Sequence, residues 1–496
     1  MGQNFTAATF GIDANLVPPD SNGAIGPNHF VEFINGRFSV FNKSSGARVQ
    51  TSSDIGFWNN AGVAIPGGAL VSDPRVIYDP GSGRWFASQI DFFPGNEVSN
   101  RFLLAVSATS DPTGSWSGVG WMADPGGSFA DYPRLGLDAK GVYLTGNQFD
   151  LAGNLTGVLI TSIPKADLLL GSPTVSNRTT SGLVSISERG FTLQPVVNFA
   201  ATNNSFVVAV ESDGTDFQTH NILKSFEVQG ADSPSAVFTT NIDITVPDYF
   251  VPINPPQPNG DDSLDDGDVR IGGYVFQVGD VVYAAHAVEE GPRAVIRWYR
   301  LRASDHTLLE AGTLSDPDLD LFYPSIAANT NGFVVIGCNG TSTNMFISSY
   351  GFAGRTINGT TVFGSKVLLK AGAANYQRPA GRSNRWGDYS TTTVDWGAPN
   401  HFWTIQEFPS AENIWSTQVT EVIVSETLPN LTILPTGTNI VLSWPTNDFG
   451  FSLQAASSIA PSVAWSPMTN PVVVAGTLNT VSVSASDALR FFRLAR

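Results

Sequence analysis

The sequence predicts an all-β protein, a seven-bladed β-propeller followed by a small C-terminal β-sandwich, and three observations lead to this fold class. The 49 glycines, 31 prolines and 32 phenylalanines favour many short strands joined by turns over long helices. A strand–turn–strand pattern recurs along most of the chain, which is typical of propeller blades. The pattern stops near Leu428, where a different arrangement of strand-like runs begins.

Each copy of the repeat opens with a cluster of polar or aromatic residues that leads into a short strand. In a propeller this strand is the innermost of its blade. The first copy begins near Ala24. The later copies begin at Ser72, Asp131, Leu193, Asp268, Tyr323 and Trp386.

A second strand rich in Val, Tyr and Phe follows a turn at Gly, Asn or Asp in every copy. Further β-rich runs such as Phe102–Val106 and Ala294–Tyr299 come after it, so each copy supplies about four strands. The second strands are predicted at His29–Ile34, Trp85–Ile90, Val142–Thr145, Phe206–Val210, Val281–Ala285, Phe333–Gly337 and Phe402–Ile405.

The end of the repeat predicts a domain boundary. We expect the propeller to span residues 1–427 and a separate accessory β-sandwich to span residues 428–496. Strand-like runs in the second segment include Val441–Pro445 and Leu489–Leu494. We predict no catalytic constellation in this segment.

Composition excludes several classes of partner. The chain carries 43 acidic and 26 basic residues, a net charge of -17, which repels nucleic acid and anionic membrane surfaces. No apolar stretch reaches the roughly 18 residues of a membrane span, so we predict no membrane insertion. The single cysteine, Cys338, excludes an internal disulfide and a thiolate metal cluster.

Radial blades would gather polar side chains at one face, at the starts of the innermost strands and the ends of the second strands. The innermost-strand starts supply Asp73, Arg75, Asp131, Tyr132, Arg134, Gln194, Asp268, Arg270, Tyr323, Arg385 and Asp388. The second-strand ends supply Asn35, Gln89, Asn147, Glu211, His286, Asn339 and Glu407.

Two interpretations of these polar groups stay open. The aspartates and arginines could pair between neighbouring blades and close the ring, because buried ions need partners. Alternatively, they line a funnel suited to a hydroxylated anionic ligand such as a sugar acid. In that case the predicted substrate-binding residues are Arg75, Arg134, Arg270, Arg385, Asn147, Gln89 and Tyr389.

Candidate catalytic groups follow from residue chemistry. His286 could transfer a proton near neutrality beside Tyr323, although a hydrogen-bonded core histidine is the ordinary alternative. Enough carboxyl groups for a two-acid glycosidase are provided by Glu211, Glu407, Asp73, Asp131 and Asp388.

We predict no histidine metal site and no cofactor, because no pair of histidines has ligand spacing. The acidic loop Asp261–Asp268 offers oxygen ligands suited to Ca²⁺, but it lacks the full spacing of an EF-hand loop, and a solvated loop is the alternative.

Several blocks resemble secreted bacterial propeller proteins: Asp131–Gly136, Ala284–Val288, Arg293–Tyr299, Phe322–Ile326 and Arg385–Ser390. More distantly, the chain is similar to sialidase-like (BNR-type) propellers. The C-terminal segment resembles modules of secreted Verrucomicrobia proteins. This resemblance implies a secreted or cell-surface location.

In sialidases three arginines grip the substrate carboxylate, a role that the resemblance gives to Arg75, Arg270 and Arg385. The chain departs from the sialidase pattern, since only Ser110–Trp116 approaches the repeated Asp-box and its spacing is altered. Other seven-bladed propellers are polysaccharide lyases, whose proton abstraction would suit His286 with Tyr323.

We therefore expect a secreted carbohydrate-active enzyme, a glycoside hydrolase or a polysaccharide lyase, that acts on an acidic polysaccharide or oligosaccharide at the mouth of the propeller channel. The alternative is a non-catalytic cell-surface propeller that binds glycans or proteins.

Overall fold

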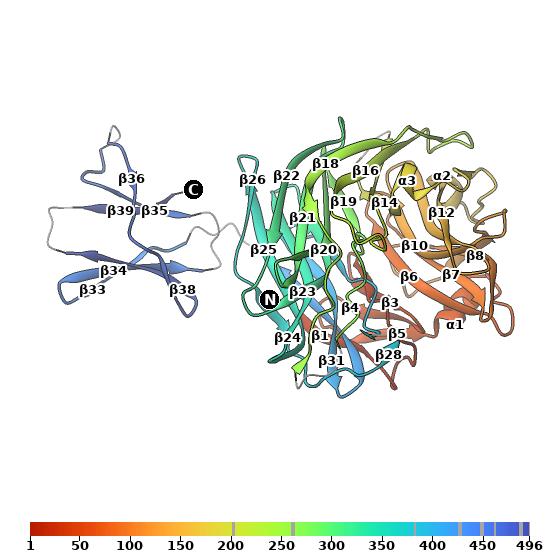
Figure 1. Ribbon diagram of the computed structural model, residues 1–496, viewed down its shortest axis with the longest axis horizontal. Helices are drawn as coiled ribbons and strands as arrows, with labels where there is room; N and C mark the ends of the chain where they lie inside the picture. Colours follow the sequence, from red (N-terminus) through yellow and green to blue (C-terminus); the bar gives the residue numbers. More distant parts are fainter. Residues whose placement is uncertain are drawn as a thin grey trace. The chain divides into compact units, whose positions relative to one another are not determined.

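The computed structural model describes residues 1–200, 204–258, 263–380, 383–424, 429–446, 451–460, 463–485 and 490–495. The described residues are almost entirely β, which confirms the predicted fold class at this level (Figure 1). The helices among them are short: α1 (Asp54–Asn60), α2 (Lys165–Leu168) and α3 (Ile186–Arg189). None of the helices described is long and apolar enough to cross a membrane.

The chain divides into two compact units. The first contains Met1–Asn331, Val335–Gly351 and Leu368–Ile423, and the second contains Gly332–Val334, Phe352–Val367 and Val424–Arg496. The second unit thus includes a segment from the middle of the chain as well as its C-terminal part. The predicted boundary at residue 428 stays a prediction.

The first two sheets of the first unit are antiparallel meanders in which each strand pairs with the next along the chain. The strands of the first are β2 (Asn22–Ile25), β3 (His29–Ile34), β4 (Arg37–Asn42) and β5 (Arg48–Ser52). The strands of the second are β6 (Leu70–Asp79), β7 (Arg84–Phe93), β8 (Asn96–Ser107) and β9 (Trp116–Met122).

The next three meanders are joined into one hydrogen-bonded sheet, because β10, β14 and β19 touch through short parallel pairings. The first meander comprises β10 (Phe129–Leu137), β11 (Gly141–Phe149), β12 (Leu155–Pro164) and β13 (Thr179–Thr180). The second comprises β14 (Phe191–Asn198), β15 (Asn204–Val210), β16 (His220–Gln229), β17 (Val237–Phe238) and β18 (Ile242–Tyr249). The third comprises β19 (Val275–Val278), β20 (Val281–Glu290), β21 (Arg293–Arg302) and β22 (Thr307–Leu314).

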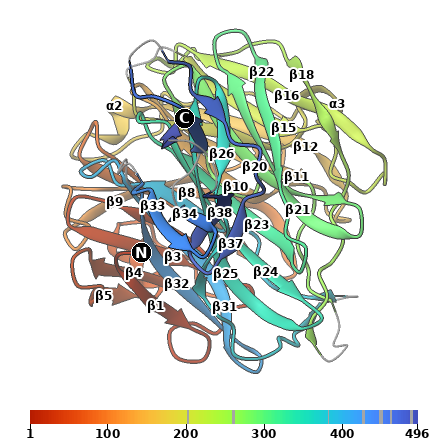
Figure 2. The same cartoon turned by 90° about the vertical axis from the view of Figure 1, so that its left-hand side faces the viewer.

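One sheet joins the two ends of the first unit, and it contains some of the strands that remain before residue 424. The strands that remain are β23 (Asp320–Ala328), β24 (Phe333–Ser342), β25 (Met345–Ile357), β26 (Thr360–Phe363), β27 (Val367–Lys370), β28 (Pro379–Ala380), β29 (Ser383–Asn384), β30 (Thr391–Val394), β31 (His401–Ala411) and β32 (Ile414–Ile423). The N-terminal strand β1 (Asn4–Thr9) pairs antiparallel with β32, and the sheet order is β1-β32-β31-β30 (Figure 2).

The strand predictions hold well in this unit. Each of the seven predicted second strands lies within an observed strand, from β3 to β31. The polar clusters at Asp268 and Trp386 instead lie in loops, and their inner strands β19 and β30 begin later, at Val275 and Thr391. The Asp268 carboxylate accepts a hydrogen bond from the Arg270 backbone nitrogen at 2.7 Å, which holds this segment in a local turn.

Large apolar side chains fill the space between neighbouring sheets. Phe33 of β3, Trp58 of α1 and Trp85 of β7 share one core and are fully buried. Burial of each such side chain contributes about 1.5–3 kcal/mol relative to exposure. Aromatic residues at the pleated positions of short strands therefore hold the successive sheets together.

The second unit contains two sheets around a small core of their own (Figure 1). One has the order β33 (Thr432–Thr436), β34 (Asn439–Pro445), β38 (Leu478–Ser484), β37 (Val473–Ala475). The other has the order β36 (Ser466–Pro467), β35 (Ser452–Ala456), β39 (Phe491–Ala495). Leu442 and Val481 from the first sheet and Leu453 from the second are buried in the shared core.

Glu32 links the sheet that follows the N-terminus to the sheet that ends the first unit. Its side chain is fully buried, and its Oε1 accepts a hydrogen bond from the Thr417 hydroxyl at 2.5 Å. Burial raises the pKa of Glu32 from 4.5 to about 7. The native state therefore binds a proton here that the unfolded chain releases above its ordinary pKa.

We expect Glu32 to lower stability as pH rises from about 4.5 to about 7, by up to about 3 kcal/mol, with no further loss above that range. Glu32→Gln should remove this part of the pH dependence and leave the protein more stable at pH ~8. Urea unfolding at a series of pH values from ~4.5 to ~8 measures the free energy of unfolding of the parent protein and of Glu32→Gln. Glu290→Gln, at a carboxylate whose side chain is 55% exposed, is the control, and equal pH slopes in the two variants would contradict the assignment.

Candidate functional site

A cavity of about 480 Å³ lies in the first unit, lined by residues from the beginning, middle and end of that unit. We call it the aspartate cavity, because seven aspartates and two arginines line it. Phe92 and two tyrosines supply aromatic surface. The charged and tyrosine residues of its lining are Asp20, Asp73, Asp131, Tyr132, Asp265, Asp266, Asp268, Arg270, Tyr323, Arg385 and Asp388.

Left-handed backbone places several of these residues at the starts of inner strands. Asp73, Tyr132 and Tyr323 have φ values of 61°, 53° and 47°, and each is followed by a proline. The pairing of β6 with β7 shifts register between Ser72 and Arg75, and that of β10 with β11 shifts between Asp131 and Arg134. A bulge re-aims side chains that would otherwise alternate across the sheet, so these residues reach the cavity.

Asn35, at the end of β3, connects two of the lining aspartates. Its Nδ2 donates to Asp20 Oδ2 at 2.9 Å, and its Oδ1 accepts from the Asp73 backbone nitrogen at 3.0 Å. Asp73 Oδ2 in turn accepts from the Tyr132 backbone nitrogen at 3.1 Å. These bonds hold the side chains of three separate segments in one network.

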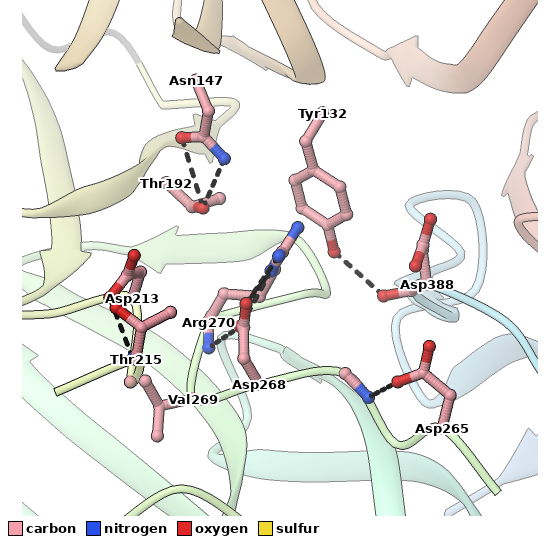
Figure 3. A network of polar contacts seen from close by, with 12 residues as sticks. Tyr132, Asn147, Thr192, Asp213, Thr215, Asp265, Asp268, Val269, Arg270 and Asp388 are labelled. Carbon is pink, nitrogen blue, oxygen red and sulfur yellow. Dashed lines mark hydrogen bonds and ion pairs between the residues drawn. The ribbon is translucent and has the colours of Figure 1, made fainter. Parts of the chain in front are cut away.

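Both lining arginines are paired with lining aspartates. Arg270 Nη2 lies 2.5 Å from Asp268 Oδ2, and Arg385 Nη2 lies 2.6 Å from Asp388 Oδ2. The Tyr132 hydroxyl donates to the Asp388 backbone oxygen at 2.9 Å (Figure 3). The guanidinium of Arg270 also lies 4.2 Å from the centre of the Tyr132 ring. The two arginines are therefore held by ion pairs and a ring contact with other residues of the cavity wall.

Burial raises the pKa of five of the lining aspartates, Asp265 among them. Burial, followed by the nearby Asp73 charge, raises the pKa of Asp131 to about 7. Burial also raises the pKa of Asp20, Asp73 and Asp266, with like charges adding to the effect. A carboxyl group with a pKa near 7 can carry a proton at neutral pH and give it to a ligand.

A second set of polar residues lies outside the cavity lining and joins the sheets. Arg75 is fully buried, with its guanidinium 3.2 Å from the Tyr389 ring centre and its Nε donating to the Pro133 oxygen at 3.2 Å. Arg134 Nη2 donates to the Gly273 oxygen at 2.7 Å. Tyr389 donates from its hydroxyl to the Pro74 oxygen at 3.0 Å. These contacts connect segments of different sheets through backbone oxygens and a tyrosine ring, whereas the ring-closing interpretation expected pairs of arginines with aspartates.

Of the predicted second-strand ends, Asn35 is the one in the cavity lining. Asn147 Nδ2 donates to the Thr192 hydroxyl at 3.0 Å, and Gln89 Oε1 accepts from Trp58 Nε1 at 2.6 Å. Glu211 Oε2 lies 3.1 Å from His220 Nδ1. The partners of these three side chains lie in β14, α1 and β16, away from the cavity lining.

His286 is completely buried and does not line the cavity. Its Nδ1 lies 2.6 Å from the Val269 backbone oxygen and its Nε2 lies 3.0 Å from the Tyr299 hydroxyl. Burial lowers its pKa to about 4. These are the surroundings of a neutral, hydrogen-bonded core histidine, and a catalytic role for His286 stays a prediction.

The structure thus brings together part of the predicted site. Asp131, Tyr323, Asp388, Arg270 and Arg385 line one cavity. Arg75, Arg134, Tyr389, Asn147, Gln89, Glu211 and His286 do not.

Sequence reasoning missed Asp20, Asp265 and Asp266 as cavity residues. Asp20 lies two residues before β2 and Asp73 lies within β6, and both have left-handed backbone near the start of an inner strand. A polar residue ahead of the first inner strand was the available signal. Asp265 and Asp266 belong to the acidic loop that we interpreted as a Ca²⁺ ligand set or a solvated loop. Asp261 and Asp262 of that loop lie outside the described residues.

Among the residues that the structure describes, no group of three or more His, Cys, Asp or Glu side chains is arranged to hold a metal ion.

Comparisons with known proteins give remote likenesses only. No family model matches the chain, and no curated protein matches it. Semaphorin 1b from Drosophila, extracellular domains 1–2, is 9% identical with a TM-score of 0.41, covering 85% of this chain and 87% of that one. A Trypanosoma rangeli sialidase in complex with sialic acid is 9% identical with a TM-score of 0.39, covering 86% and 81%.

An α-L-arabinofuranosidase from Clostridium thermocellum is 15% identical with a TM-score of 0.30, covering 56% of this chain and 81% of that one. At these scores the likenesses carry no argument about this chain, and its chemistry must be inferred from its own cavity.

Asp131 should titrate with an apparent pKa of about 7, because burial and neighbouring carboxylates disfavour its charged form. Infrared difference spectra of the carboxyl band, recorded from pH ~5 to ~9, would show this step together with that of Glu32, whose pKa is also raised to about 7. In a Glu32→Gln background, Asp131→Asn should abolish the step. Asp150→Asn in the same background, which removes an exposed carboxyl whose pKa is lowered, is the matched control. A step that survives in the variant lacking both Glu32 and Asp131 would assign it to another group.

His286→Leu should lower stability by about 1–3 kcal/mol, since it leaves the Tyr299 hydroxyl and the Val269 oxygen without this partner. Thermal unfolding measures the loss, and ligand binding per folded molecule should be unchanged. Unchanged stability combined with lost binding or turnover would instead support the predicted catalytic role.

Proposed function

We propose that the aspartate cavity is the active site of a glycoside hydrolase. One observation carries the proposal: Asp131, whose pKa is raised to about 7, shares a single cavity with Asp388, which is ion-paired with Arg385. A carboxyl group that keeps its proton and a carboxylate held by a cation are the two groups that glycoside cleavage needs.

The roles follow from these environments. Asp131 gives its proton to the glycosidic oxygen as the bond to the anomeric carbon breaks. The negative charge of Asp388 stabilises the positive charge that develops on the sugar ring, and water completes the cleavage. Arg385 positions Asp388 through their 2.6 Å ion pair, and the Tyr132 hydroxyl steadies the same segment at the Asp388 backbone oxygen.

The size and lining of the cavity support a sugar ligand. Its volume of about 480 Å³ falls within the usual range for small-molecule sites, about 300–1,000 Å³. Carboxylates accept hydrogen bonds from sugar hydroxyls, while Tyr132, Tyr323 and Phe92 offer apolar surface to the ring faces.

Hydrolysis fits this lining better than elimination. A lyase needs a base together with a cation that neutralises the substrate carboxylate. Both lining arginines are already paired with aspartates, and burial raises the pKa of Tyr323, which keeps its hydroxyl protonated. The excess of aspartates also favours a glycan without acidic groups over the acidic one that we expected from the sequence.

We further propose that the sheets of the first unit are the blades of a seven-bladed propeller. The successive meanders, and the pairing of β1 with β32 that joins the first and last strands, support this architecture. The two sheets of the second unit support a C-terminal β-sandwich beginning near residue 428, and we keep the secreted or cell-surface location as part of the proposal.

Asp131→Asn and Asp388→Asn should each lower kcat by at least about 100-fold on a susceptible oligosaccharide, with melting temperatures close to the parent value. The parent rate should fall as pH rises through about 7, where Asp131 loses its proton. Release of reducing ends from a panel of neutral, basic and acidic oligosaccharides measures this, and Asp280→Asn at a loop outside the cavity is the control.

Products with the ultraviolet absorbance of an unsaturated sugar would show elimination instead. Retained binding without any product would favour a non-catalytic glycan-binding protein.

A further inference from the structure

The charges of the aspartate cavity do not balance within its wall. Its seven aspartates face two arginines, so five negative charges would stay uncompensated if every group were ionised. Arg75 adds one nearby positive charge outside the lining, where its guanidinium stacks on Tyr389. Even with Arg75, the carboxyl groups outnumber the guanidinium groups more than two to one.

This imbalance reaches two buried side chains of the lining, Asp20 and Asp266. Of these two, Asp20 is the one that lies close to Asp73 and Asp388 across the cavity wall. The Asp20 side chain is 1% exposed and lines the cavity, and it lies close enough to Asp73 and Asp388 for their charges to act on it. Asn35 donates to Asp20 Oδ2, whereas Oδ1 has no hydrogen-bond partner among the described residues. A buried carboxylate oxygen without a donor is costly, and a ligand that donates a hydrogen bond would satisfy it.

The two neighbouring aspartates, Asp73 and Asp388, already have hydrogen-bond or ion-pair partners. Asp73 already accepts from the Ser72 hydroxyl at 2.7 Å and from the Tyr132 backbone nitrogen at 3.1 Å. Asp388 is engaged by Arg385. Asp20 therefore presents an acceptor to the cavity beside two further carboxyl groups, which is a setting for a positively charged donor.

An organic cation suits the cavity better than a metal ion does. Among the described side chains no group of three or more potential ligands is arranged for a metal. The cavity volume of about 480 Å³ far exceeds the roughly 30 Å³ that one water molecule occupies in the liquid. Tyr132 already holds the Arg270 guanidinium against its ring, so the wall combines aromatic and anionic surface in the way that recognises organic ammonium groups.

We propose that the aspartate cavity binds a glycan with a protonated primary amine, an amino sugar without its acetyl group, whose ammonium donates to Asp20. This inference rests on the proposed glycoside hydrolase function and names its substrate class. The ammonium occupies the side of the cavity formed by Asp20 and Asp73, and the neighbouring glycosidic bond reaches Asp131 and Asp388.

Isothermal titration of the full chain with three matched tetrasaccharides tests the proposal: β-1,4-glucosamine, β-1,4-N-acetylglucosamine and β-1,4-glucose. We expect the glucosamine tetramer to bind at least ten times more tightly than the other two, with an affinity that weakens as salt rises. Equal affinities, or tighter binding of an oligouronate, would overturn the proposal.

Asp20→Asn should remove the preference for the amine and keep the weaker binding of the neutral tetramers. Asparagine tolerates the left-handed backbone at this position, where φ is 54°, so the variant is expected to fold. Asp73→Asn, at φ 61°, provides a second test within the same cluster, and Asp280→Asn is the control outside the cavity. A preference that survives both cavity variants would contradict the site assigned here.

Calcium chloride alone is a separate arm of the titration. Saturable calcium binding that is lost in Asp20→Asn and competes with the glucosamine tetramer would identify a metal site and overturn the proposal. Cleavage of a neutral glycan without amine preference would refute only this inference, whereas amine-selective binding without cleavage of any substrate would refute only the proposed hydrolase activity.

Discussion

The pairing of β1 with β32 is the constraint on which the aspartate cavity depends. It joins residues about four hundred positions apart, and the Ala8 backbone nitrogen donates to the Thr417 hydroxyl at 2.9 Å within it. Trp415 of β32 donates from its indole nitrogen to the Leu16 oxygen at 3.0 Å. Leu16 lines the cavity and precedes Asp20, so this closure brings an N-terminal aspartate to a site completed by Arg385 and Asp388.

Backbone strain is concentrated at the same site. Left-handed conformations at non-glycine residues are uncommon, and those at tyrosine are the more costly because its side chain gains no local hydrogen bond there. Such residues cost of order 1–3 kcal/mol each and persist only where the surrounding structure holds them. Tyr132 and Tyr323 both line the cavity and both precede a proline. The fold thus tolerates strain where it turns side chains toward the cavity.

The arginines near the cavity fall into two sets with different partners. Arg75 and Arg134 are buried outside the cavity lining, where they stack on tyrosine rings and donate to backbone oxygens of other sheets. Arg270 and Arg385 lie in the lining and are paired with aspartates. Burial raises the pKa of Asp20, Asp131 and Asp266, although Arg385 and Arg75 oppose the shift at Asp20 and Arg270 opposes it at Asp131. The excess of carboxyl groups over guanidinium groups in the lining underlies both the acid chemistry and the preference for a basic ligand that we propose.

The sequence by itself determined the all-β class and the positions of the strands, since β-branched and aromatic runs between turn residues form strands through local preference. It also predicted that Asp131, Tyr323 and Asp388 would meet in space, and all three line the cavity. Only the tertiary structure decided which polar groups reach the cavity. The sequence predicts His286, Asn147 and Asn35 alike at the ends of second strands, yet of these three only Asn35 lines the cavity. Burial, bulges and cross-sheet hydrogen bonds set that outcome, and these depend on contacts between residues that are remote along the chain.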